Sequence, residues 1–367
     1  MVIPPPRRQE QEAFTLVEVL IATGVTLVLI TVLLVLVGQL SDSVRLSRAS
    51  ADEFQVAQRV FSTLAERVAQ ATLNNYRDSP EVNKKVQLNQ RMSELRFACG
   101  PMEGGANAIG GLAQTMRPGH GIFFQAATGR PRLARDPALL GLDNLINTWG
   151  YFVETGPDIL PPPSFLPPET AAQRIAPRLL EMCEPTERLS IYRYTSIEPG
   201  TVEAPKQYLG LDWIRTPLGD RTLVHTLAEN IAVLLIVPKL TPQETARLLP
   251  GGTAEQRDAF LAPQLYYHSG APASLGVDAA HNMRHRLPAL VELTMVALDG
   301  ASVARLYGPN SLDPFQIGKA FHKATKINAE LRIDPAEPER DSLERRLIDA
   351  HAHHRIFTTI VPIRAAQ

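Results

Sequence analysis

A long apolar run near the start of the chain limits what the rest of the chain can become. The run extends from Phe14 to Val37, about 24 residues, which as a helix would span roughly 36 Å, enough to cross the ~30 Å hydrocarbon core of a bilayer. No proline interrupts it, and Glu18 is its one formal charge. A carboxylate inside hydrocarbon is costly and usually has a function. The sequence therefore predicts one membrane-spanning helix with a functional acid near its start.

The rest of the composition indicates a loop-rich body without a nucleic-acid partner. The chain has 367 residues and a net charge of −1, with 30 prolines and 23 glycines. Acidic and basic residues are interspersed, so no basic field favours nucleic acid. This length accommodates a membrane anchor together with one large or two small globular domains.

The segment that precedes the apolar run differs from a secretory signal peptide. A secretory signal has an apolar region of about 7–15 residues with the small-residue cleavage site after it. Here residues 1–13 are polar and rich in proline, and the small residue Ala13 comes before the run. Two arginines precede the run and two closely follow it, so the positive-inside rule gives the helix no orientation.

The stretch Ala13-Phe14-Thr15-Leu16-Val17-Glu18-Val19-Leu20-Ile21-Ala22 resembles the N-terminal cleavage and methylation motif of type IV prepilins and type II secretion pseudopilins. The resemblance implies that the prepilin peptidase cuts between Ala13 and Phe14, and that Phe14 is then N-methylated. It also implies that Glu18 pairs with the terminal amine of a neighbouring subunit during assembly. The chain departs from the family at Ala13, where the family usually has glycine.

The same resemblance implies a location and a set of partners. The N-terminus would be cytoplasmic, the single span would lie in the inner membrane, and the body would be periplasmic. An inner-membrane assembly platform would then move the subunit into a filament with other pseudopilin or pilin subunits.

A second helical segment follows the apolar run. Apolar residues recur at spacings of three and four in the stretch up to Tyr76, which contains no proline or glycine: Phe54, Ala57, Phe61, Leu64, Val68 and Ala71. We interpret this seam as the packed face of a continuous stem, with an independent amphipathic helix as the alternative. The expected organisation is a leader at 1–13, a transmembrane helix at 14–40, a stem at 41–76 and a globular domain at 77–367.

Strand and helix patterns alternate through the globular domain. The predicted strands lie at 95–98, 121–124, 149–154, 188–195, 230–237, 288–298 and 356–363. Residues 230–237 are continuously apolar after Asn230, which predicts burial on both faces. Pro362 marks the last strand as an edge strand or as the end of a strand. The predicted helices lie at 242–249, 254–261, 315–331 and 342–353, the last with Asp341 as its cap.

These elements predict an α+β fold, with a long N-terminal transmembrane-plus-stem helix packed on an antiparallel sheet. The apolar strands from 227, from 287 and from 356 resemble the closing strands of J-type minor pseudopilins and W-type minor pilins, and the chain is similar to the Verru-Chthon cassette protein C group. On this pilin-like reading, loop-rich insertions lie at about 100–187, 241–286 and 299–355.

Cys99 and Cys183 are the two cysteines of the chain. If the body lies outside the cytoplasm, they could form a disulfide that closes a long loop, worth roughly 3–5 kcal/mol in the chain-entropy model. Two unpaired thiols are the alternative. Neither cysteine belongs to a CxxC motif, so zinc binding through cysteine is not expected.

No catalytic motif stands out in the sequence. GxSxG and the acidic loop of calcium sites are absent. Two groups of histidines, His281 with His285 and His351 with His353 and His354, lack the spacing of a metal motif, so we read them as polar surface. We therefore expect no catalytic residue, no cofactor and no metal.

The sequence favours a minor pseudopilin-like or pilin-like assembly subunit over an enzyme. The alternative is a signal-anchored extracytoplasmic protein, either a binding module or an enzyme, whose prepilin-like start is incidental. A surface-binding module carried on a pilin anchor would be compatible with the first reading.

Overall fold

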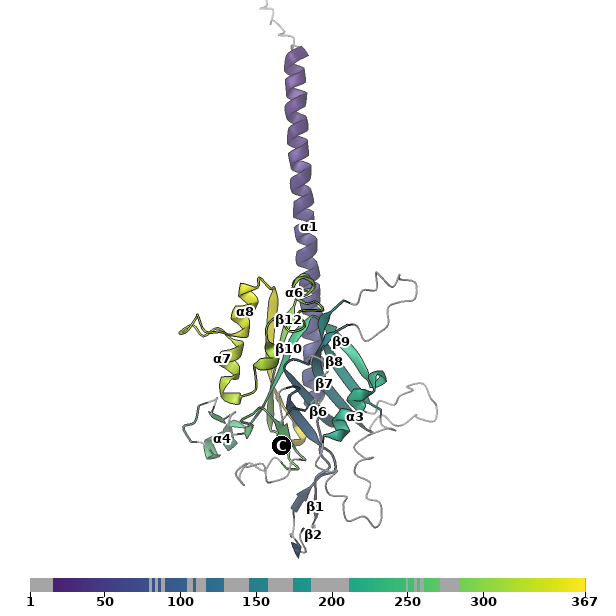
Figure 1. Ribbon diagram of the computed structural model, residues 1–367, viewed down its shortest axis with the longest axis vertical. Helices are drawn as coiled ribbons and strands as arrows, with labels where there is room; N and C mark the ends of the chain where they lie inside the picture. The colour runs from purple at the N-terminus through teal and green to yellow at the C-terminus, as the bar shows by residue number, and fades with distance from the viewer. Residues whose placement is uncertain are drawn as a thin grey trace, which may run out of the picture. The chain divides into compact units, whose positions relative to one another are not determined.

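One helix, α1, runs from Leu16 to Val68 in the computed structural model (Figure 1). The structure describes residues 16–78, 81–82, 85–86, 90–103, 108–109, 117–128, 145–157, 174–185, 211–248, 250–253, 256–257, 261–270 and 284–366. The helix has 53 residues and no proline to interrupt its hydrogen bonds. The chain divides after Asp52 into two compact units, so the last turns of α1 belong to the second unit.

The stem helix ends earlier than predicted. It stops at Val68 rather than at Tyr76, because the backbone beyond it bonds to other elements. The Thr72 N–H donates to the Gln125 carbonyl over 2.9 Å, and the Ala69 carbonyl accepts from the Arg364 N–H over 3.1 Å. These bonds replace the helical ones that a longer α1 would have made.

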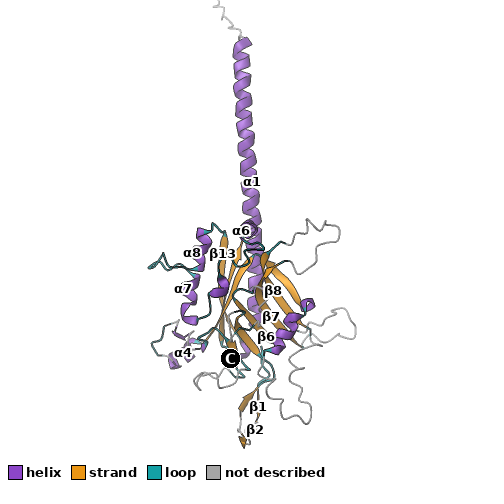
Figure 2. Ribbon diagram, viewed as in Figure 1, coloured by secondary structure: helices purple, strands orange, loops and turns teal. Residues whose placement is uncertain are grey.

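The larger sheet of the second unit has six antiparallel strands in the order β11-β5-β6-β7-β8-β9 (Figure 2). Their bounds are Phe97–Pro101 for β5, His120–Ala127 for β6, Ile146–Gly156 for β7, Ala176–Glu184 for β8, Val224–Glu229 for β9 and Tyr267–His268 for β11. Residues 100–187, which we expected to be a loop-rich insertion, therefore contribute three neighbouring strands, β6, β7 and β8.

A second antiparallel sheet has the order β10-β12-β13. Its strands are β10 at Ile231–Lys239, β12 at Leu290–Leu298 and β13 at His354–Pro362. Every residue of β10 from Ile231 to Pro238 is buried, which confirms the predicted burial on both faces. Among the described strands β13 pairs with β12 alone, which confirms the predicted edge strand.

The main core lies where the last part of α1 meets both sheets. Side chains of the predicted seam, Ala57, Phe61, Leu64 and Val68, pack there with Phe124 and Tyr151 of the six-stranded sheet and with Leu234 and Met295 of the three-stranded sheet. Leu64 and Val68 have no exposed surface. The periodicity of the stem therefore predicted its buried face correctly.

Helices cover the outer faces of the two sheets. Trp213 and Ile214 of α3, Asp212–Gly219, pack on Phe123 and Phe152 of the six-stranded sheet. The opposite face of the three-stranded sheet packs against α6, Gly300–Leu306, α7, Ile327–Leu331, and α8, Leu343–Asp349. The predicted helix at 242–249 is confirmed as α4, Pro242–Leu248, and that at 254–261 lies partly outside the described residues.

Smaller elements complete the second unit. A two-stranded ribbon pairs β1, Tyr76–Asp78, with β4, Gln90–Met92, and a second short pair joins β2, Glu81–Val82, to β3, Lys85–Val86. The 3₁₀ turns are η4 at Arg221–Leu223, η6 at Ile317–Lys319, η7 at Ala324–Lys326 and η8 at Arg364–Ala366. The predicted strand at 188–195 lies outside the described residues.

The predicted helix at 315–331 is wrong, since the chain there forms η6, η7 and the short α7. Gln316 and Phe321 adopt positive φ angles of 51° and 63°, which interrupt a right-handed helix. The Asp313 carboxylate accepts from the N–H groups of Ile317 and Gly318, each over 2.8 Å. This side chain therefore closes a tight turn where a longer helix would have needed carbonyl acceptors.

The predicted cap of the last helix is also wrong. Ser342 caps α8, because its hydroxyl accepts from the Arg345 N–H over 3.3 Å. Asp341 instead lies 3.1 Å from the Arg346 guanidinium as an exposed ion pair. Ser342 thus makes the capping bond to a backbone N–H, whereas the partner of Asp341 is a side chain.

His120 of β6 bonds to the backbone of β10, which is an edge strand of the three-stranded sheet. Its Nδ1 accepts from the Ile236 N–H over 2.9 Å, so its Nε2 carries the proton and donates to the Phe321 carbonyl over 2.7 Å. Gly119 makes this approach possible, since a Cβ at its φ of 84° would lie 2.5 Å from Val233. Burial lowers the pKa of His120 to about 4 despite its two backbone bonds, so the imidazole is neutral.

We expect His120 to make folding sensitive to acid. Its pKa is lower in the folded state than the ~6.5 of an unfolded histidine, so unfolding takes up a proton. The free energy of unfolding should therefore fall as pH drops from about 6.5 to about 4, by about 1.4 kcal/mol per pH unit within that window for this one group. Chemical denaturation at several pH values should show a shallower slope for His120→Gln than for the wild type. The exposed His353→Gln is the control, and equal slopes in the wild type and His120→Gln would contradict the assignment.

Candidate functional site

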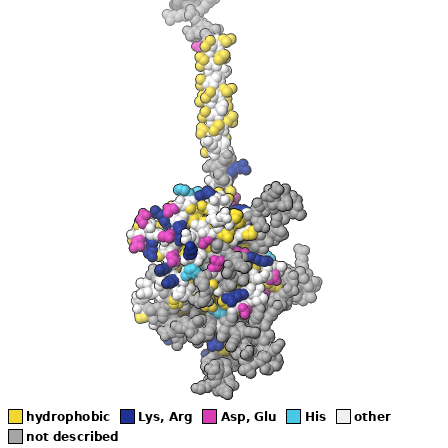
Figure 3. Space-filling view, viewed as in Figure 1, with side chains coloured by type: hydrophobic (Ala, Val, Ile, Leu, Met, Phe, Trp, Pro, Cys, Tyr) yellow, Lys and Arg dark blue, Asp and Glu magenta, His cyan; other side chains and the backbone are white. Residues whose placement is uncertain are grey.

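The first part of α1 forms an exposed apolar surface. Leu16–Ser41, 26 residues, is long and apolar enough to cross a membrane, and none of its most apolar stretch is buried. Figure 3 shows its side chains as mainly hydrophobic. A continuous apolar surface of this kind is found at membrane or protein contacts rather than in water. This segment could therefore be a single membrane span or a signal anchor.

The threonines of this segment satisfy their hydroxyls within the helix. Thr23, Thr26 and Thr31 donate to carbonyls one turn earlier, over 2.9, 2.7 and 2.8 Å. Such back-bonding lets a hydroxyl remain in hydrocarbon without a partner from another chain. Gly24 and Gly38 carry no side chain, and a Cβ added at either position would meet nothing within 4 Å.

Glu18 occupies the first turn of α1. A carboxylate there interacts favourably with the exposed N–H groups at the start of the helix. A carboxylate only accepts hydrogen bonds, so the carbonyls of its own helix cannot satisfy it as they satisfy the threonines. Ala13 and Phe14, the predicted cleavage and methylation residues, lie outside the described residues.

The other end of α1 is held by a polar cluster that we define as Arg67, Trp149, Tyr151 and Glu181. Arg67 donates to the Tyr151 hydroxyl over 2.9 Å and forms an ion pair with Glu181. Its guanidinium lies 4.3 Å from the centre of the Trp149 ring, within range of a cation–π interaction. Tyr151 donates in turn to Glu181 over 3.2 Å. The cluster therefore joins α1 to β7 and β8.

Burial governs the chemistry of this cluster. The Glu181 side chain is 6% exposed and that of Arg67 is 26% exposed. Burial and the neighbouring Glu181 carboxylate raise the pKa of Tyr151, so the phenol stays protonated and acts as a donor. Sequence reasoning missed all four residues, because they come from distant parts of the chain and carry no shared motif.

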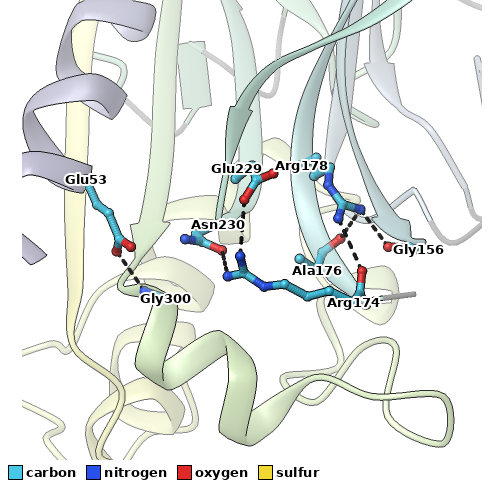
Figure 4. A network of polar contacts seen from close by, with 8 residues as sticks. All are labelled: Glu53, Gly156, Arg174, Ala176, Arg178, Glu229, Asn230 and Gly300. Carbon is cyan, nitrogen blue, oxygen red and sulfur yellow. Dashed lines mark hydrogen bonds and ion pairs between the residues drawn. The ribbon is translucent and has the colours of Figure 1, made fainter. Parts of the chain in front are cut away.

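A second polar contact holds α1 at Glu53 (Figure 4). Its carboxylate accepts from the Gly300 N–H at the start of α6 over 2.7 Å. A Cβ at Gly300 would lie 2.8 Å from the Glu53 carboxylate, so a side chain there would displace this carboxylate from its position. In the same region Arg174 donates to Asn230 over 3.1 Å and pairs with Glu229 over 3.3 Å.

The proposed disulfide is wrong. Cys99 lies on β5 and Cys183 on β8, and β6 and β7 separate these strands. Three strand spacings amount to roughly 14 Å, whereas a disulfide needs Cα atoms within about 7 Å. Accordingly, no disulfide joins these two described residues. Cys99 is fully buried, and burial raises the pKa of its thiol.

The histidines occupy separate environments. His285 is buried, and its Nδ1 accepts from the Ser93 N–H over 3.0 Å, which contradicts our reading of it as polar surface. His351 and His353 are exposed, and the His354 Nδ1 lies 3.0 Å from the Ala352 carbonyl. His281 lies outside the described residues. In the described part of the chain, no three His, Cys, Asp or Glu side chains are grouped to hold a metal.

Comparisons with known proteins assign no family. The chain matches no protein-family model, and no curated protein or solved structure is significantly similar to it.

We expect the Arg67 cluster to be a major source of stability. Arg67→Ala leaves the Glu181 carboxylate buried without its cation, which typically costs about 3–5 kcal/mol of the free energy of unfolding. The matched control is Arg174→Ala, which breaks an ion pair whose side chains are half-exposed and should cost less than about 1 kcal/mol. Denaturant titration of both variants checks the difference. Similar losses of unfolding free energy in both variants would show that the Arg67–Glu181 pair contributes no more to stability than an exposed ion pair.

Proposed function

We propose that this chain is a minor pseudopilin-like or pilin-like subunit. On this proposal a prepilin peptidase removes residues 1–13, and the mature protein enters a filament of the type II secretion or type IV pilus kind. One observation carries most of the weight: one continuous helix has an exposed apolar first part with Glu18 in its first turn and a last part built into an antiparallel α+β body.

The division of α1 supports assembly through the exposed part. Contacts of Glu53 and Arg67 fix the last part of the helix within its own subunit. The first part presents mainly apolar side chains, three threonine hydroxyls bonded within the helix, and Glu18. In hydrocarbon, the terminal ammonium of one subunit and the Glu18 carboxylate of the next would each replace the other's lost hydration.

A role in assembly also agrees with the chemistry of the body. His120 and Tyr151, whose pKa values burial shifts strongly, hold strands and helices together through their hydrogen bonds. Each of these hydrogen bonds joins two groups of the body itself. We therefore propose a structural subunit of the inner membrane and periplasm rather than an enzyme.

The first test concerns processing. When the full chain is expressed with a prepilin peptidase, mass spectrometry of the N-terminal peptide should show cleavage between Ala13 and Phe14 and a methyl group on Phe14. Ala13→Gly, which restores the residue usual in the family, should be cut at least as fast. An intact leader would instead favour a signal-anchored protein, and a cut after the apolar run would favour a secreted one; either result contradicts the proposal.

The second test concerns Glu18. Glu18→Ala should leave membrane insertion and cleavage unchanged but abolish incorporation into filaments, because the terminal ammonium of the adjacent subunit loses its counterion. Glu66→Ala, which removes an exposed acid from the last part of α1, is the matched control and should assemble normally. Co-purification with sheared filaments measures the difference. Normal incorporation of Glu18→Ala would rule out the charge pairing.

A further inference from the structure

Two arginines face each other across the ribbon of β1 and β4. In its antiparallel register Arg77 lies directly opposite Arg91, with Tyr76 opposite Met92 and Asp78 opposite Gln90 on the two sides. Directly opposed residues of antiparallel strands point to the same face, with Cβ atoms about 5 Å apart. Two positive charges therefore share one face of a narrow ribbon.

Neither guanidinium forms an ion pair within the described part of the chain. Both arginines are exposed, and no acidic side chain in the described part of the chain forms an ion pair with either of them. Like charges directly opposed on a ribbon destabilise it. The Arg77–Arg91 pair therefore weakens its own ribbon unless an anion lies between the two side chains.

Hydrogen bonds at the base of the ribbon hold its two strands in place and so fix the position of the arginine pair. Asn74 Oδ1 accepts from the Ser93 hydroxyl over 2.9 Å and from the N–H groups of Glu94 and Leu95 over 2.9 and 3.0 Å. The Ser93 N–H donates to buried His285 over 3.0 Å. Both strands of the ribbon are thus anchored within two or three residues of the arginines. Figure 2 shows the ribbon extending beyond the ends of the sheet strands, where a partner could reach it.

We propose that Arg77 and Arg91 form a binding site for an oxyanion with two negative charges, either a phosphate group or a pair of carboxylates on a partner molecule. Two guanidiniums match such a ligand in charge, and each can donate two parallel hydrogen bonds to its oxygens. Arginine suits this task better than lysine because its donors are fixed in a plane. This site does not depend on the filament role, because it lies on the body and uses neither Glu18 nor α1.

Hydrogen exchange of the full-length protein in detergent tests the site. Sodium phosphate, sodium malonate and sodium chloride are compared at equal ionic strength, with malonate as the two-carboxylate probe. We expect phosphate or malonate, but not chloride, to slow exchange of the β1 and β4 amides by roughly two- to fivefold, since the anion removes the repulsion across the ribbon. Protection by phosphate alone identifies a phosphate ligand, and protection by malonate identifies a carboxylate ligand.

Variants make the result specific. Arg77→Gln and Arg91→Gln should each abolish the anion effect, whereas Arg355→Gln, which removes an exposed arginine of β13, should leave it intact. Both ribbon variants change exposed side chains, so neither should disturb the core. Equal exchange of β1 and β4 in all three salts would overturn the proposal. An anion effect that survives in Arg77→Gln and Arg91→Gln would overturn it as well.

Discussion

The packing of one helical seam against two sheets is the interaction on which the rest of the body depends. Phe61, Leu64 and Val68 of α1 reach side chains of both sheets in one core. The inner faces of both sheets pack against this helix, while helices α3, α6, α7 and α8 lie on the opposite faces. The polar contacts of Arg67 and Glu53 then fix the rotation and position of this helix on the body. Apolar contacts are not directional and would specify this position less closely.

The seam and the apolar strands could be predicted because their signals are local. Leu64 and Val68 follow the period of a helix, and β10 is continuously apolar where a surface strand would alternate apolar and polar residues. The strands β6 and β7 were predicted only in part, because buried polar residues such as His120, Gln125 and Asn147 break their apolar patterns. Their polar groups are satisfied by partners distant in sequence, as the bonds of His120 to Ile236 and Phe321 illustrate.

The failures of prediction share the same physical origin. Helical pattern extends through 315–331, but the Asp313 carboxylate takes the N–H groups that a helix would use. A disulfide between Cys99 and Cys183 was one of two alternatives open from the sequence, and only the strand order shows that two strands separate them. Arg67 and Glu181 are separated by 114 residues, so no local pattern relates them. Glu18 was recognisable from the sequence because a lone charge in an apolar run is itself a local signal.

The acids that lie on α1 or bond to it differ in their surroundings. Glu53 meets a backbone N–H of its own subunit, and Glu181, which Arg67 brings to the helix, is satisfied by a cation and a phenol. These contacts are closed within the body and contribute to its folding. Glu18 lies instead in a segment where every described side chain from Leu16 to Ser41 is exposed. On the proposed role in assembly, removal of this carboxylate would impair assembly without impairing folding, because Glu18 does not belong to the core of the body.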